Sequence, residues 1–178
     1  MAVAGPDSRK PKNPKSCHER ALGLLAVRAR SRRELERRLL QAGFEGPEVA
    51  DVLERLERVG LIDDDAFAAQ VVEHAFAVKR SGRRAVASTL AAAGVPRDVI
   101  ENALSQGGED ESERADALAA SRAARLGSLE PAKAFSRLTS LLVRRGYSPE
   151  MARGAARKAL EIRGSEDDPN LASGFTRP

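Results

Sequence analysis

Three glycines at a nearly constant spacing constrain the fold of this chain more than any other feature. Gly43 and Gly94 lie 51 residues apart (from 43 to 94), and Gly146 follows after another 52 (from 94 to 146). Each glycine ends a helix-like apolar pattern and is followed by an apolar residue, which is typical of a left-handed glycine that terminates a helix. The spacing therefore predicts that one helical unit occurs three times along the chain.

The apolar residues keep one register relative to these glycines. The residues eight and four positions before each glycine form an apolar pair on one helix face, and the pairs are Leu35 and Leu39, Val86 and Leu90, and Leu138 and Leu142. A further helix is expected before each pair, over residues 16–29, 64–80 and about 109–126. No alternating run of β-branched residues indicates a strand.

We therefore predict an all-α fold of three tandem three-helix repeats, stacked into an elongated, curved array in which each repeat covers its neighbour's apolar face. The alternative is one compact helical bundle. The predicted domains are a disordered basic N-terminal arm (1–15), the three repeats (16–60, 61–106 and 107–163) and a disordered C-terminal tail (164–178). The arm is rich in proline and lysine, and the tail has too little apolar pattern to fold.

The stretch GLIDDDAFA contains three consecutive aspartates, Asp63, Asp64 and Asp65. On a helix, neighbouring side chains point in different directions, so these carboxylates are poorly placed to converge on one cation. An aspartate at an N-cap accepts backbone N–H groups, and first-turn carboxylates oppose the positive end of the helix dipole. We therefore predict that the run starts a helix.

Two further helix starts carry the capping-box pattern, Ser16 with Glu19 and Ser31 with Glu34. In this pattern the hydroxyl accepts an N–H and the carboxylate reaches back to the cap. Glu34 and Glu36 also occur amid arginines, where we expect solvated ion pairs of small energetic value.

Catalytic and membrane functions find little support in the residues. His18 and His74 fall in different predicted repeats, no Walker-type loop is present, and the single Cys17 offers no metal-ligand set. We expect no enzyme activity, no cofactor and no bound metal. With no apolar run near the roughly 18 residues that cross a bilayer and no signal-like N-terminus, we also expect no membrane partner and a cytoplasmic location. We further expect a monomer.

Basic residues cluster at equivalent predicted turns of the first two repeats, although the net charge is only +4. We name as the first corner Arg28, Arg30, Arg32 and Arg33, and as the second corner Lys79, Arg80, Arg83 and Arg84. Because a repeat places equivalent turns on equivalent positions, we expect both corners on one side of the array, with Arg144 and Arg145 extending the stripe or forming a second patch. These ten residues are the candidate contacts to a protein partner or to DNA phosphates. The alternative is that they oppose helix dipoles and keep the surface soluble.

The combination of motifs resembles the bacterial RecX family of recombination regulators. The resemblance rests on GLIDDDAFA, preceded by ALGLLAVRARSRRELERRLLQAGF and followed by KRSGRRAVASTLAAAGV and LLVRRGYSPEMA. It implies a modular all-helical fold, no catalytic residues, and binding in the helical groove of the RecA–DNA filament, with suppression of ATP hydrolysis, strand exchange and filament extension. End-capping, groove blocking and disassembly all stay open as the mode of inhibition. The rival hypotheses are a sequence-independent DNA-binding helical-repeat protein without a recombinase partner, and a generic helical scaffold.

Overall fold

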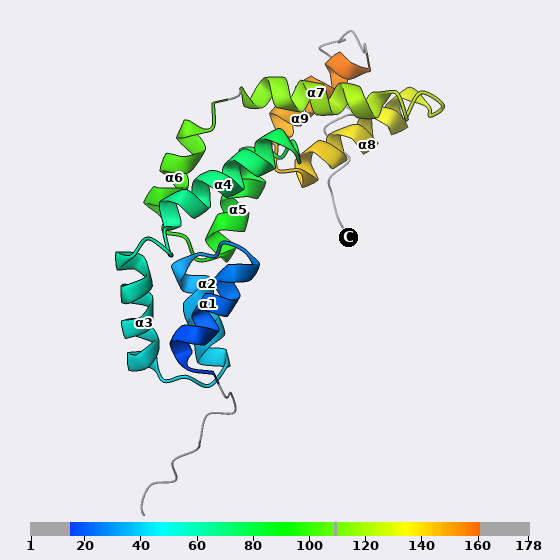
Figure 1. The fold of residues 1–178 in the computed structure, drawn as a ribbon. Coiled ribbons are helices and arrows are strands. Elements are labelled where there is room, and N and C mark those ends of the chain that lie inside the picture. The colour runs from blue at the N-terminus through cyan, green and yellow to red at the C-terminus, as the bar shows by residue number, and fades with distance from the viewer. Residues whose placement is uncertain (1–14, 109, 161–178) are drawn as a thin grey trace, which may run out of the picture. The chain divides into compact units, whose positions relative to one another are not determined.

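The structure is a computed structural model that describes residues 15–108 and 110–160, and over these residues the chain forms nine helices and no strand (Figure 1). The predicted all-α fold is therefore confirmed. The helices are α1 (Cys17–Val27), α2 (Arg32–Gln41), α3 (Gly46–Arg58), α4 (Asp64–Ala77), α5 (Arg83–Ala92), α6 (Arg97–Gln106), α7 (Glu111–Ala123), α8 (Pro131–Arg144) and α9 (Pro149–Ala159). Within the described residues, no helix combines the length and apolar content needed to cross a membrane.

The three spacing glycines end the middle helix of three successive helix trios. Gly43, Gly94 and Gly146 have φ values of 94°, 82° and 93°, a backbone conformation that L side chains rarely adopt. After each glycine, the next N–H donates back to the carbonyl of the last buried residue of the apolar pair, and these bonds are Phe44 to Leu39, Val95 to Leu90 and Tyr147 to Leu142. The predicted helix ends are thus confirmed, with the glycine and the apolar residue after it in their expected roles.

Several helices are shorter than the sequence pattern predicts. The first helix ends at Val27 because Arg28 takes an extended backbone (φ −166°, ψ 159°), and α4 ends at Ala77, before Arg80 with its positive φ of 48°. The helix predicted over about 109–126 spans 111–123. The corner residues therefore lie largely in turns. The predicted tails fall outside the described residues, except for Lys15.

The described residues divide into two compact units. Of the described residues, the first unit holds 15–74 together with 87–107, and the second holds 75–86 together with 108 and 110–160. Helices α4 and α5 contribute to both units. Since these limits differ from the predicted repeat limits, the repeat limits stay a prediction, as does the elongated, curved arrangement.

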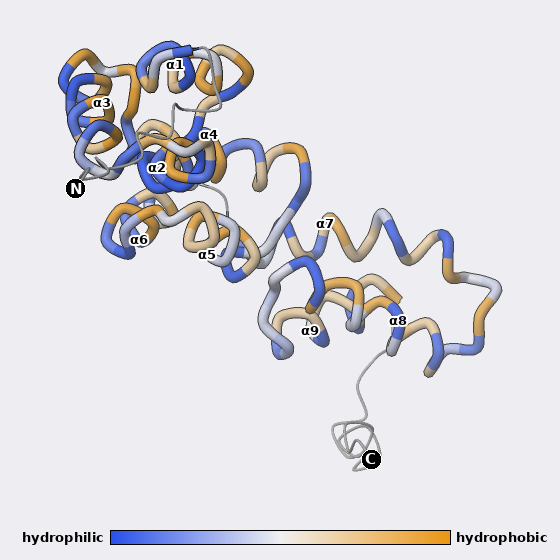
Figure 2. Tube along the Cα trace, turned by 90° about the horizontal axis from the view of Figure 1, so that it is seen from below, coloured by the Kyte–Doolittle hydropathy of each residue, from blue (hydrophilic) through white to orange (hydrophobic). Residues whose placement is uncertain are grey.

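Each unit contains its own apolar core. The six residues of the predicted pairs are at most 2% exposed, which confirms the register read from the glycines. In the first unit the core unites α1, α2 and α3 around Leu35, Leu39 and Leu53. In the second unit, α9 buries Ala152, Ala155 and Ala156, whereas α3 of the first unit buries valines and leucines, so α9 packs through small side chains. Figure 2 shows the alternation of hydrophobic and hydrophilic residues along the helices that this packing requires.

Candidate binding interface

The turn between α1 and α2 is held against two other segments of the first unit. The Ser31 hydroxyl donates to the Ala93 carbonyl in the turn after α5 and accepts from the Glu34 N–H at 3.1 Å, which caps α2. Gly94 lies so close to this turn that a Cβ added there would come within 2.5 Å of the Arg33 side chain. The Arg32 N–H donates to Asp64 Oδ1 at 2.8 Å. We call this set of contacts the first joint.

The turn between α4 and α5 is held in the same way within the second unit. The Gly82 N–H donates to the Arg145 carbonyl at 2.8 Å, and the Arg145 guanidinium donates to the Lys79 carbonyl at 2.7 Å. The buried Tyr147 hydroxyl donates to the Arg80 carbonyl, also at 2.7 Å. A Cβ added to Gly82 would lie 2.5 Å from the backbone nitrogen of Tyr147, so the two turns meet backbone to backbone. We call these contacts the second joint.

In both joints, a carboxylate at the start of a later helix accepts a hydrogen bond from the N–H at the start of an earlier helix. Arg32 and Arg83 are the first residues of α2 and α5, and Asp64 and Glu111 are the first residues of α4 and α7. The Arg83 N–H donates to Glu111 Oε1 at 2.7 Å, as the Arg32 N–H does to Asp64. The first N–H groups of a helix have no partner within that helix, and here the carboxylates of α4 and α7 accept hydrogen bonds from those of α2 and α5. The two corners are therefore built on one local design.

The aspartate run contributes to both its own helix and the first joint. Asp63 Oδ1 accepts from the Ala66 N–H at 2.9 Å, so the predicted helix start is confirmed. Asp64 instead reaches the N–H of Arg32. Burial raises the pKa of the Asp64 carboxyl, although the hydrogen bond from Arg32 acts in the opposite direction.

Two arginines of the first corner are bound to a buried carboxylate. Glu34 is only 5% exposed, and its Oε1 accepts from Arg28 at 2.6 Å, from Arg38 at 2.9 Å and from the Arg30 guanidinium. Arg30 is itself buried and also donates to the Leu24 carbonyl at 3.1 Å. Burial by itself raises the pKa of Glu34, but the hydrogen bonds from Arg28 and Arg38 and the charges of Arg28 and Arg30 together outweigh burial, so the pKa lies below its ordinary value.

This cluster corrects two predictions about Glu34. Glu34 is not a solvated ion pair, because its carboxylate is buried among guanidinium groups. The capping box at Ser31 is also only half formed: Ser31 accepts from Glu34, whereas the Glu34 carboxylate turns to the arginines. At Ser16 both halves of the box are present, with Glu19 Oε2 accepting from the Ser16 N–H at 2.8 Å.

Fewer side chains of the first corner are therefore available for a partner than the sequence predicted. Arg33 is its most exposed member, with a side chain 73% exposed and a long 4.0 Å contact to Glu36. Arg32 pairs with Glu57 at 2.8 Å and stays 40% exposed, and Arg28 is 50% exposed. Arg30 is buried, and its hydrogen bonds to Glu34 and the Leu24 carbonyl stabilise the fold.

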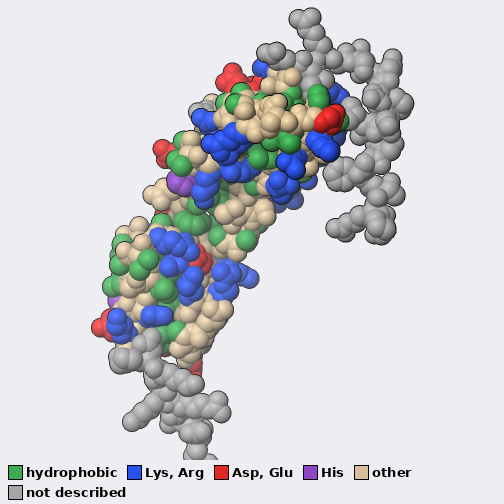
Figure 3. Space-filling model, turned by 90° about the vertical axis from the view of Figure 1, so that its right-hand side faces the viewer, with side chains coloured by type: hydrophobic (Ala, Val, Ile, Leu, Met, Phe, Trp, Pro, Cys, Tyr) green, Lys and Arg blue, Asp and Glu red, His purple; other side chains and the backbone are tan. Residues whose placement is uncertain are grey.

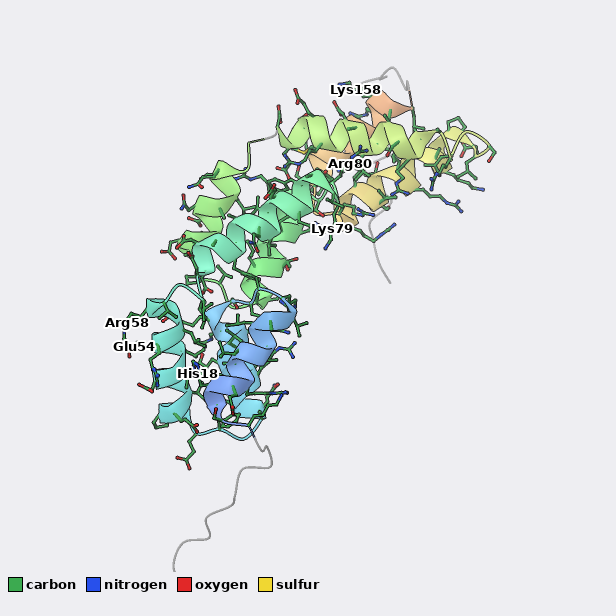
Figure 4. All side chains as sticks on the ribbon, viewed as in Figure 1. His18, Glu54, Arg58, Lys79, Arg80 and Lys158 are labelled. Atoms are coloured by element: carbon green, nitrogen blue, oxygen red, sulfur yellow. The ribbon has the colours of Figure 1, made fainter. Side chains whose placement is uncertain are left out.

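The side chains of the second corner form no ion pair within the part of the chain that the structure describes. Lys79, Arg80 and Arg84 are exposed and Arg83 is half-buried. Among the described residues, no carboxylate forms an ion pair with these four side chains, in contrast to the first corner. Figure 4 places Lys79 and Arg80 together where α4 ends.

The remaining predicted contacts lie beside the second corner. Arg145 is joined to it through the carbonyl of Lys79, and Arg144 at the end of α8 is exposed. The second unit therefore brings the second corner together with Arg144 and Arg145. The first corner belongs to the other unit, so its alignment with the second corner on one stripe stays a prediction.

Three arginines that the sequence analysis did not single out share a surface with Arg144. Arg122, Arg125 and Arg137 line, with Arg144, an open cavity of about 530 Å³ between α7 and α8. A periodic signal was available in part, because Arg137 and Arg144 lie two helical turns apart and Arg122 and Arg125 lie three residues apart. What the sequence lacked was the pairing of α7 with α8, which the loop between them does not specify.

The chain is similar to proteins of known family along most of its length. Residues 17–56 match the first three-helix domain of RecX, and residues 63–104 match its second three-helix domain. The "Regulatory protein RecX" of Mycobacterium sp. (strain JLS) is 39% identical over 155 residues, which cover 84% of this chain and 85% of that protein. The protein of the same name from Streptomyces coelicolor is 37% identical over 86% of this chain and 82% of its own length. The crystal structure of RecX from Lactobacillus salivarius has the same fold, with a TM-score of 0.70 at 20% identity over 82% of this chain and 96% of that one.

Fold and site together define a class of tandem three-helix proteins whose turns carry arginine and lysine and whose repeats are joined by carboxylate-capped corners. The sequence relationships make the family specific. The chain belongs to the RecX family of regulatory proteins.

Proposed function

We propose that this protein regulates recombination by binding the RecA–DNA filament in its helical groove, and that binding inhibits ATP hydrolysis and strand exchange. Membership of the RecX family supports the regulatory class. The observation that carries the proposal is the second corner, where four basic side chains lack ion pairs among the described residues. The contacts proposed are the second corner, Arg144 and Arg145, and the exposed members of the first corner.

The physical basis of the inhibition is a preference for one filament state. A protein that bridges neighbouring recombinase subunits binds best to the arrangement that fits its spacing, and so shifts the filament toward it. Repeated modest contacts along the chain add up to useful affinity when several subunits are engaged at once. No step of this mechanism requires the protein to act as an enzyme.

The test is recombinase ATPase activity and strand exchange, measured with this protein added first below and then at the molar amount of recombinase. We expect both activities to fall, with inhibition already evident below equal amounts if the protein acts on assembled filaments. Unchanged ATPase and strand exchange at both levels would refute the proposal.

The unpaired second corner also suits the phosphates of bare DNA, which makes sequence-independent DNA binding the second candidate. Contacts to the phosphate backbone release counterions, so affinity for bare DNA should fall steeply with salt. Binding to bare DNA and to the assembled filament is therefore compared at about 150 mM salt. The filament is expected to bind more tightly; equal or tighter binding to bare DNA would favour the second candidate.

A further inference from the structure

A cavity between α7 and α8 is lined by both arginines and leucines. Its volume is about 530 Å³, within the range of about 300–1,000 Å³ typical of ligand pockets. The lining residues are Arg122, Arg125, Leu126, Ser136, Arg137, Leu138, Ser140, Leu141 and Arg144. Figure 3 shows basic side chains gathered around hydrophobic surface on the part of the molecule that carries α7 to α9.

The charge of this cavity is not neutralised within the described residues. No carboxylate lines it, and none of its four arginine side chains forms an ion pair with a described residue. Some other exposed arginines are paired, since Arg38, Arg55 and Arg58 each contact a carboxylate one helical turn away. Because four like charges around one cavity repel each other, an anionic occupant would be stabilised there.

The leucines in the lining distinguish between two possible anionic ligands, a nucleic-acid backbone and an acidic peptide. Leu126 and Leu141 are half-buried beside the arginines, and the fully buried Leu138 lies beneath them. A nucleic-acid backbone offers phosphates and sugars but no apolar side chain to cover leucines. A peptide offers both, since carboxylates accept the planar fork of a guanidinium while a neighbouring apolar side chain is buried. Protein interfaces commonly have this arrangement of an apolar centre with arginine at its edge.

We propose that this cavity binds an acidic peptide segment of a partner protein. An apolar side chain of the segment covers Leu126 and Leu141, and flanking carboxylates bind Arg122 and Arg137. The Ser136 and Ser140 hydroxyls offer further hydrogen bonds at the edge of the cavity. The inference is independent of the two corners and of the recombinase, because it rests on residues that the proposed filament contacts do not include, apart from Arg144.

The test measures binding of the full chain to three labelled probes by fluorescence anisotropy. The probes are a short peptide of alternating Asp and Leu, the same peptide with Ser in place of every Leu, and an oligothymidine of equal charge. We expect the Asp–Leu peptide to bind most tightly. Arg122→Gln and Arg137→Gln should each weaken its binding about tenfold, the scale of one lost charge-assisted hydrogen bond.

The matched control is Arg153→Gln, because Arg153 is exposed on α9 and does not line the cavity. It should leave peptide binding unchanged, and helical circular dichroism should be the same for all variants. Oligothymidine bound as tightly as the peptide, with the same dependence on Arg122 and Arg137, would assign the cavity to nucleic acid and overturn the proposal. Equal losses in all three variants, or no peptide binding, would overturn it as well. Failure here leaves inhibition of the recombinase unaffected, so the two proposals fail separately.

Discussion

At the scale of single residues, the buried Glu34 carboxylate determines what the first corner can do. It binds Arg28, Arg30 and Arg38 through one oxygen, so its one negative charge offsets one of the four positive charges of this corner inside the fold. Sequence alone does not separate these arginines from exposed ones, because both kinds occur in the same arginine-rich run, RARSRRELERR. Burial of Glu34 depends on the turn at Ser31, which brings the carboxylate beneath three guanidinium groups.

Glu34→Gln should lower the free energy of unfolding by about 2–3 kcal/mol, because it leaves the buried Arg30 without its counter-charge. Urea denaturation measures this loss. The control is Glu54→Gln, since the Glu54–Arg58 pair lies on the exposed face of α3 with both side chains about two-thirds exposed (Figure 4). The control should be nearly unchanged. Equal stability of the two variants would contradict the assigned role of Glu34.

The pH dependence of stability follows from the lowered pKa of Glu34. A carboxyl with a folded pKa below its unfolded value stabilises the fold above the unfolded pKa, and that stabilisation is lost as pH falls through the folded pKa. Between about pH 5 and pH 3 the wild type should therefore lose more stability than Glu34→Gln does. Asp64, whose pKa is raised, contributes with the opposite sign, but equally in both proteins. Parallel pH profiles would refute this assignment.

At the scale of elements, the joints explain which features of the sequence were informative. Helix ends at Gly43, Gly94 and Gly146 were predictable because the cause is local: a left-handed glycine followed by an apolar residue. The hydrogen bonds to Asp64 and Glu111 were not predictable. These carboxylates lie 32 and 28 residues along the chain from the N–H groups whose hydrogen bonds they accept. The aspartate run therefore indicated a helix start correctly but concealed a second role.

Glu111→Ala should lower the free energy of unfolding by about 1 kcal/mol, because the first N–H of α5 loses its carboxylate acceptor. Glu113→Ala is the control, since Glu113 is exposed on the same first turn of α7 and shares its interaction with the helix dipole. Thermal unfolding of both variants distinguishes the contribution of the hydrogen bond to Arg83 from that of the interaction with the helix dipole. If the control lost as much stability as Glu111→Ala, the hydrogen bond between Glu111 and the Arg83 N–H would add nothing to the stability of the fold.

Close packing at the second joint gives a second prediction for the elements. Gly82→Ala should destabilise the protein by about 1–3 kcal/mol, because the added Cβ would overlap the backbone at Gly146 and Tyr147. Gly154→Ala, in the interior of α9 with no atom within 4 Å of the new Cβ, should raise stability by about 0.5–1 kcal/mol. Opposite signs in urea denaturation are expected. A neutral Gly82→Ala would show that the two turns do not meet as tightly as described.

At the scale of the whole molecule, the proposed function depends on basic turns that recur with the repeat. The recurrence was visible in the sequence, and the structure adds that each corner is fixed by the same kind of joint. The arginine cavity between α7 and α8 was not foreseen, because residues 122 and 137 come together only through the packing of two helices. At the first corner Arg30 is buried, and the cavity of the second unit is a separate candidate site.

The most direct test measures binding to the assembled recombinase–DNA filament at fixed salt for the double variant Arg33→Glu with Arg84→Glu. Both residues are exposed members of the two corners. The matched control is Arg58→Glu with Arg97→Glu, which reverses two exposed arginines that lie outside the corners. We predict that the corner variant loses at least about tenfold in affinity with its helical circular dichroism intact, while the control binds as the wild type does. Filament binding by the corner variant at wild-type affinity would contradict the account.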